Sequence, residues 1–143
     1  MLSLRICIRE CDVLSIHCPL TPETRHIVGH AAIQMMKNDA VIINVARGAL
    51  IDSRALLYAL RKGQIGGAAI DVYEGEGEYF FNDWSTKVVE DDVLARLMSL
   101  PNVIITGHQA FLTKNALKNI ADATLGSLRA FEEGADLVNE VKA

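Results

Sequence analysis

Three side chains of different chemistry, Arg47, Glu76 and His108, each follow a separate apolar stretch of the sequence. An arginine holds a carboxylate through two parallel hydrogen bonds. A histidine gives or takes a proton near neutral pH, and a neighbouring glutamate favours its charged form. Together these groups suit the reduction of a 2-oxo acid or the oxidation of a 2-hydroxy acid, and the hydride for either reaction has to come from a cofactor.

Apolar runs typical of buried strands alternate along the chain with segments of helical periodicity. This alternation predicts an α/β fold, a partial Rossmann-like (doubly wound) parallel sheet with a long C-terminal helix. Residues 2–10 fit either a strand or a helix, and residues 74–90 are predicted to form a long acidic and aromatic loop. The predicted strands are residues 12–18, 40–45, 66–73 and 103–106, and the predicted helices are residues 30–37, 53–62, 91–99 and 113–133.

The carboxyl ends of parallel strands lie along one edge of a sheet, where ligands bind in open α/β folds. Arg47, Asp71 and His108 are all expected at this edge, although they are far apart in the sequence. Gly48 would let the chain turn sharply beneath Arg47. Asp52 would cap the helix that follows by accepting hydrogen bonds from its first N–H groups.

Each candidate residue also has a plainer interpretation. Taken alone, Arg47 fits an exposed surface arginine, His108 fits a turn or core histidine, and Glu76 fits a solvated residue of an acidic loop. A carboxylate that ends an apolar strand, as Asp71 does, needs a partner. The presence of an arginine, carboxylates and a histidine at three successive strand ends favours the functional interpretation.

The composition limits the classes of function. The 143-residue chain has 14 Lys and Arg against 18 Asp and Glu, a formal net charge of −4, which argues against nucleic acid as a partner. It contains no apolar run long enough to span a bilayer and no signal-peptide cleavage pattern, so we expect a cytoplasmic protein without a membrane partner. The cysteines, Cys7, Cys11 and Cys18, form no Cys-x-x-Cys pair, so we expect reduced thiols and no metal site.

Four segments carry a resemblance to a known family. They are residues 15–21 (SIHCPLT), 43–52 (INVARGALID), 71–76 (DVYEGE) and 107–113 (GHQAFLT). Together they resemble the NAD-dependent D-2-hydroxyacid dehydrogenases, and within that family the D-lactate branch. The resemblance implies that residues 1–110 are the C-terminal half of the NAD-binding domain. It also implies that residues 111–143 are a C-terminal helix and tail that return to the substrate domain in full-length relatives.

The resemblance also implies the reaction and the role of each residue. The cofactor would be NAD, and the reaction would be the reduction of pyruvate, or a similar 2-oxo acid, to its D-2-hydroxy acid with NADH. Arg47, Glu76 and His108 would be the catalytic residues. Arg47 and His108 would also bind the substrate, with Phe111 close to it. The implied cofactor-binding residues are Cys18, Pro19, Thr24, Val45, Ala46, Arg47 and Asp71.

The sequence departs from the family pattern in two respects. It lacks the Gly-x-Gly-x-x-Gly turn that places a pyrophosphate at a helix N-terminus and the acidic residue about twenty positions later that binds the ribose. It also lacks a separate substrate domain. We therefore expect a C-terminal fragment that is inactive alone. A non-catalytic remnant or interaction module of the same family is the alternative.

The resemblance carries an expectation about assembly as well. Full-length relatives are homo-oligomers. In this chain the apolar stripe of the helix predicted over residues 113–133 would be partly uncovered, which favours self-association.

Overall fold

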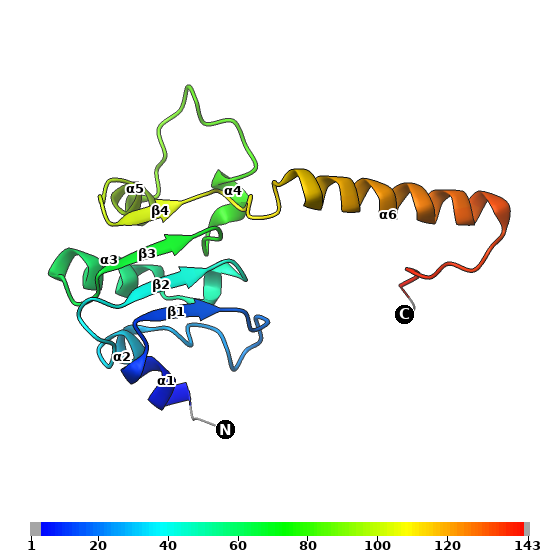
Figure 1. Cartoon of the computed structure of the whole chain (residues 1–143). Helices are drawn as coiled ribbons and strands as arrows, with labels where there is room; N and C mark the ends of the chain where they lie inside the picture. The colour runs from blue at the N-terminus through cyan, green and yellow to red at the C-terminus, as the bar shows by residue number, and fades with distance from the viewer. Residues whose placement is uncertain (1–3, 142–143) are drawn as a thin grey trace. The chain divides into compact units, whose positions relative to one another are not determined.

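Four parallel strands form a sheet in the order β1-β2-β3-β4 (Figure 1). The structure, a computed structural model, describes residues 4–141 and divides into two units, Met1–His108 and Gln109–Ala143, of which the first holds the sheet. The parallel α/β sheet predicted from the sequence is confirmed, and the carboxyl ends of its strands share one edge. The strands are β1 (Val13–Ile16), β2 (Val41–Asn44), β3 (Gly67–Ile70) and β4 (Val103–Ile105).

Helices cover one face of this sheet and enclose the hydrophobic core. The strand side chains that point toward them, such as Ile16, Ile42 and Ile70, are buried with Leu56 and other helical residues in one cluster. On the opposite face, side chains at the two outer strands remain exposed, 54% for Val13 and 63% for Ile104. The covering helices are α1 (Leu4–Glu10), α2 (His30–Ile33), α3 (Ser53–Lys62) and α5 (Asp92–Met98).

Local signals set the helix boundaries. The side chain of Asp52 accepts hydrogen bonds from the first N–H groups of α3, and Asp91 does the same for α5. The helix α3 ends at Gly63, which has a left-handed φ of 65°. In the second unit, α6 (Lys114–Glu133) begins after the cap Thr113.

Some elements differ from the sequence prediction. Residues 4–10 form the helix α1, which settles the ambiguous start, and residues 2 and 3 lie outside the described part. The predicted helix over residues 30–37 is shorter because Met35 and Met36 bond three residues back and tighten the chain into a turn. The predicted loop over residues 74–90 contains the short helix α4 (Glu76–Tyr79), and the 3-10 turn η1 (Gly48–Leu50) follows Arg47.

The second unit consists mainly of α6, and its apolar side chains are exposed. None of the residues of α6 is buried, as partial exposure of the stripe predicts. Among the described residues, no helix combines the length and apolar character that a membrane crossing requires. The exposed apolar side chains of α6 are Leu117, Ile120, Leu125, Leu128 and Phe131.

Gly48 lies against the backbone that leaves β3. A Cβ atom at this position would be 2.0 Å from the carbonyl carbon of Tyr73 and 2.4 Å from the nitrogen of Glu74, both backbone atoms. We predict that Gly48→Ala lowers the free energy of unfolding by about 3 kcal/mol or more, because two backbone segments would have to separate. Urea unfolding followed by circular dichroism measures the change. Gly77→Ala is the control, since nothing lies within 4 Å of its added methyl group. Equal stability of Gly48→Ala and the unmodified chain would contradict the prediction.

Tyr73 joins the end of β3 to the start of α5. Its side chain is buried, and its hydroxyl donates to Oδ2 of Asp91 at 2.8 Å. Burial raises the pKa of Tyr73 above its usual value, and the hydrogen bond to Asp91 raises it further. The folded protein therefore keeps this phenol protonated at a pH where the unfolded chain has lost the proton, and folding stability falls as the pH rises above about 10.

We predict that Tyr73→Phe lowers the free energy of unfolding near neutral pH by about 1–2 kcal/mol, because one buried hydrogen bond is lost. We also predict that the variant loses less stability than the unmodified chain between about pH 9 and about pH 11, since no phenol titrates at this position. Urea unfolding at both pH values measures these effects. Tyr58→Phe is the control, because Tyr58 is half exposed on α3. The same alkaline loss in Tyr73→Phe and the unmodified chain would refute the linkage.

Candidate active site at the carboxyl edge of the sheet

A buried amide holds the turn that carries Arg47. Asn44, the last residue of β2, is fully buried, and its Nδ2 donates to the carbonyl oxygen of Arg47 at 2.9 Å. Its Oδ1 accepts from the backbone nitrogen of Ala46 at 3.1 Å. Sequence reasoning missed this role. The available signal was a polar residue inside an apolar run, since a buried amide needs hydrogen-bond partners.

The side chain of Arg47 is exposed, in contrast to its anchored backbone. Its Nη1 donates to the carbonyl oxygen of Ala46 at 2.7 Å. Within the described residues Arg47 makes no ion pair, whereas Arg25 and Arg96 each pair with a carboxylate. The guanidinium of Arg47 is therefore available to an anionic ligand at the carboxyl edge of the sheet.

Asp71 follows β3 and links the strands on either side of it. The residue is 4% exposed. Its backbone nitrogen donates to the carbonyl oxygen of Asn44 at 2.9 Å, and its carbonyl oxygen accepts from the nitrogen of His108 at 2.5 Å. Its Oδ1 accepts a short hydrogen bond from the hydroxyl of Thr106, a contact that sequence reasoning also missed. The ends of β2, β3 and β4 are thus tied together around one buried carboxylate.

Glu76 and His108 lie side by side at this edge. The Oε1 atom of Glu76 is 3.1 Å from Nδ1 of His108, and the side chains are 19% and 34% exposed. Nδ1 is buried, and the two atoms are close enough for an ion pair but not aligned for a hydrogen bond. The other oxygen of Glu76 accepts from the backbone nitrogen of Tyr73 at 2.8 Å, which fixes the carboxylate. Glu76 is therefore not the solvated loop residue of the plainer interpretation.

The backbone at His108 is unusual. Gly107 and His108 both have left-handed conformations, with φ values of 67° and 60°. A non-glycine residue in this region is uncommon and is often found at functional sites. The ring of Phe81 lies beside the imidazole, with 5.9 Å between the two ring centroids.

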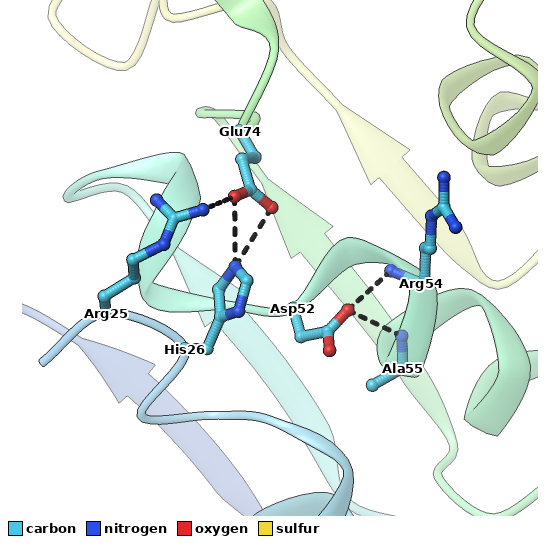
Figure 2. A network of polar contacts seen from close by, with 6 residues as sticks. All are labelled: Arg25, His26, Asp52, Arg54, Ala55 and Glu74. Atoms are coloured by element: carbon cyan, nitrogen blue, oxygen red, sulfur yellow. Dashed lines mark hydrogen bonds and ion pairs between the residues drawn. The ribbon is translucent and has the colours of Figure 1, made fainter.

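The segment after β1 carries three of the predicted cofactor residues. Within it, the hydroxyl of Thr24 donates to the carbonyl oxygen of Pro19 at 2.8 Å, so this side chain organises its own loop. Cys18 is partly buried against the core. The same segment is tied to the exit of β3, because Glu74 accepts hydrogen bonds from Arg25 and His26 (Figure 2).

The other predicted residues fall into two groups. Val45 and Ala46 lie directly after β2, where Val45 is 41% exposed and Ala46 is partly buried. Phe111 belongs to the second unit, so its place near a substrate stays a prediction. Among residues 4–141, no group of three or more His, Cys, Asp or Glu side chains is arranged to hold a metal ion.

This arrangement brings a cation and an imidazole to one edge of the sheet. The strands β2 and β4 are two steps apart in the sheet, about 10 Å at the usual strand spacing. Side chains that extend from their ends can meet on one small molecule lying over β3. Arg47 offers a cation for a carboxylate, and His108 offers an imidazole for an oxygen atom.

Comparison with known proteins shows the family of this chain. Residues 1–110 match the family described as "D-isomer specific 2-hydroxyacid dehydrogenase, NAD binding domain". The chain is 50% identical over 132 residues to a D-lactate dehydrogenase of Escherichia coli (strain K12), covering 92% of this chain and 40% of that protein.

Solved structures give the same result. A D-lactate dehydrogenase from Treponema pallidum matches with a TM-score of 0.91 and 37% identity, covering 99% of this chain and 43% of that one. A D-lactate dehydrogenase with NAD+ from Lactobacillus jensenii matches with a TM-score of 0.89 and 34% identity over the same shares. The chain therefore spans about two-fifths of the length of these relatives. Because the family match covers most of its residues, this chain belongs to the D-isomer-specific 2-hydroxyacid dehydrogenase family, through that family's NAD-binding domain.

Proposed function

We propose that this chain supplies the acid/base and carboxylate-binding part of an NAD-dependent D-2-hydroxyacid dehydrogenase site, with pyruvate and D-lactate as the substrate pair. The observation that carries the proposal is the placement of the Glu76–His108 pair at the same sheet edge as Arg47, which has no ion-pair partner among the described residues. A residue set of this kind needs a substrate with a carboxylate beside a carbonyl or hydroxyl group.

Each side chain has one task in the proposed reaction. Arg47 binds the substrate carboxylate and orients the neighbouring C2 oxygen. Nδ1 of His108 faces Glu76, so Nε2 is the nitrogen that exchanges a proton with the C2 oxygen. His108 donates this proton when a 2-oxo acid is reduced and accepts it when a 2-hydroxy acid is oxidised. Glu76 is fixed by the Tyr73 peptide, and it orients the imidazole and pairs with its charged form.

The residues present fit one end of the cofactor. The buried carboxylate of Asp71 offers an acceptor for an amide of the nicotinamide kind. Cys18, Pro19, Val45 and Ala46 lie at or just beyond the strand ends and would line the groove. The hydroxyl of Thr24 is already bonded within its loop, so Thr24 would contribute contacts other than that hydroxyl. When bound, NADH supplies the hydride.

The choice of pyruvate follows the names of the relatives. The Escherichia coli protein and several structural neighbours are named as D-lactate dehydrogenases, and a relative from Clostridium sporogenes that is 47% identical is named as an aromatic 2-oxoacid reductase. Arg47 and His108 would act alike on all 2-oxo acids. Phe111 would lie near the variable part of the substrate, and a larger D-2-hydroxy acid is therefore the alternative.

Binding of oxamate, an unreactive analogue of pyruvate, tests the site directly. We expect oxamate to shift the NMR signals of the Arg47 side chain and the His108 ring in the 143-residue chain. Arg47→Lys should weaken binding by about tenfold or more, because a lysine cannot form the two-bond contact. Arg54→Lys is the matched control on α3. Unchanged signals at both Arg47 and His108, or equal losses in the two variants, would refute the proposal.

The isolated 143-residue chain is predicted to have no measurable dehydrogenase activity, because it contains no glycine-rich turn for the pyrophosphate. NADH oxidation in the presence of pyruvate, followed by the absorbance of the reduced nicotinamide, is the measurement. Pyruvate-dependent turnover that His108→Gln abolishes would overturn this prediction while supporting the site assignment.

The two parts of the chain are proposed to have different roles in a full-length protein. Residues 1–110 would be the C-terminal half of the NAD-binding domain, and residues 111–143 would be a C-terminal helix and tail that return to the substrate domain. The exposed apolar side chains of α6 support this proposal, because an amphipathic helix normally buries its apolar stripe. In the isolated chain the same stripe favours self-association.

A further inference from the structure

Glu74 lies between the two site carboxylates in sequence, but the proposed reaction does not use it. Its carboxylate accepts hydrogen bonds from two side chains, Arg25 and His26, on the segment after β1 (Figure 2). The Nε2 atom of His26 is 3.0 Å from Oε1 and 3.1 Å from Oε2, and Nη2 of Arg25 donates to Oε1. One carboxylate therefore connects segments that are 48 and 49 residues apart in the chain.

The turn that carries Arg47 lies between these two segments. On one side, the backbone nitrogen of His26 donates to the carbonyl oxygen of Ala49 at 2.8 Å, and that of Val28 donates to Leu50 at 3.1 Å. On the other side, Gly48 is in direct contact with the backbone of Tyr73 and Glu74. The side chain of Glu74 then reaches back to His26. The contacts form a closed ring around residues 47–51.

The backbone conformation of His26 indicates that the contacts around residues 47–51 hold this part of the chain in place. Its φ value of 52° is left-handed, a conformation that costs free energy for a residue with a side chain. Such a conformation persists where surrounding contacts determine it. At His26 the backbone nitrogen bonds to the Arg47 turn while the imidazole bonds to Glu74.

The exposure of the ion pairs argues against a large contribution to overall stability. The side chains of Arg25, His26 and Glu74 are 53%, 35% and 30% exposed. Ion pairs in contact with water contribute little to the free energy of unfolding. Their effect is expected to be local, on the position of the backbone that they enclose.

We propose that Glu74 is a positioning residue for Arg47. Together with Arg25 and His26 it closes a clamp around residues 47–51 and fixes the backbone from which the guanidinium reaches the substrate carboxylate. The functional meaning of the clamp rests on the proposed function. The clamp itself is a property of the fold and can be measured without any ligand.

Hydrogen exchange of individual amides tests the clamp. In Glu74→Ala we expect the protection of the amides of His26, Val28, Leu50 and Ile51 to fall by about tenfold or more, with the amides of the β2–β3 ladder unchanged. Glu74→Gln keeps an oxygen acceptor, so the protection of these amides should lie between that of Glu74→Ala and that of the unmodified chain. Arg25→Ala removes a partner of Glu74 on the other segment. It should lower the protection of the same amides, and it tests the clamp independently if Glu74→Ala folds poorly.

Asp12→Ala is the control, because it removes another carboxylate of the same unit that forms an ion pair, with Lys37 at 2.7 Å. It should leave the four amides within about twofold of the unmodified chain. Unchanged protection in both Glu74→Ala and Arg25→Ala would overturn the proposal. An equal fall at every slowly exchanging amide would also overturn it, since that result shows a general loss of stability.

Oxamate binding separates this inference from the proposed function. If the clamp positions Arg47, Glu74→Ala should weaken oxamate binding by about threefold or more, and Glu74→Gln should recover part of the loss. If the unmodified chain does not bind oxamate, the proposed function fails, while the exchange data still decide whether the clamp exists. Oxamate binding that is unchanged in Glu74→Ala despite local loss of protection would refute the link to Arg47.

Discussion

The contact between Gly48 and the peptide of Tyr73 sets the geometry of the candidate site. There is no room for a side chain between the two backbones, so the turn after β2 packs directly against the turn after β3. Arg47 precedes Gly48 on one turn. On the other, the nitrogen of Tyr73 binds the carboxylate of Glu76. Arg47 and the carboxylate that faces His108 therefore belong to two turns whose backbones are in contact.

Buried polar groups complete this framework by connecting neighbouring strands. Asn44 binds the turn that follows β2, and Asp71 joins the ends of β2 and β4 through its backbone and side chain. Each of these groups is buried and hydrogen-bonded within the fold, which fixes its position. Arg47 differs, because its side chain is exposed and has no carboxylate partner among the described residues. The anchored backbone of this edge thus presents the exposed guanidinium of Arg47 to the solvent.

Features determined by nearby residues could be predicted from the sequence. The parallel sheet followed from alternating strand and helix patterns, and the start of α3 at Asp52 and its end at Gly63 followed from known capping preferences. The order of the strands placed Arg47 and His108 at one edge. The role of each residue in catalysis stays a prediction.

Features determined by distant partners could not be predicted. The hydroxyl of Thr106 meets the carboxylate of Asp71, 35 residues earlier, and nothing local in either segment indicates the contact. The pairing of Glu74 with Arg25 spans 49 residues. The short helix α4 was missed for a related reason, because the fixed carboxylate of Glu76 and the packing of the aromatic residues after it depend on the fold around Tyr73.

The left-handed backbone at His108 restricts which amino acids can stand at that position. Branched and bulky side chains are strongly disfavoured at a φ of 60°, while glycine, asparagine, aspartate and histidine tolerate it. Of these four, only histidine changes its charge between about pH 5 and about pH 8 with an unperturbed side chain. The left-handed backbone therefore limits position 108 to a few amino acids. Among these, histidine is the one whose side chain can carry a proton near neutral pH.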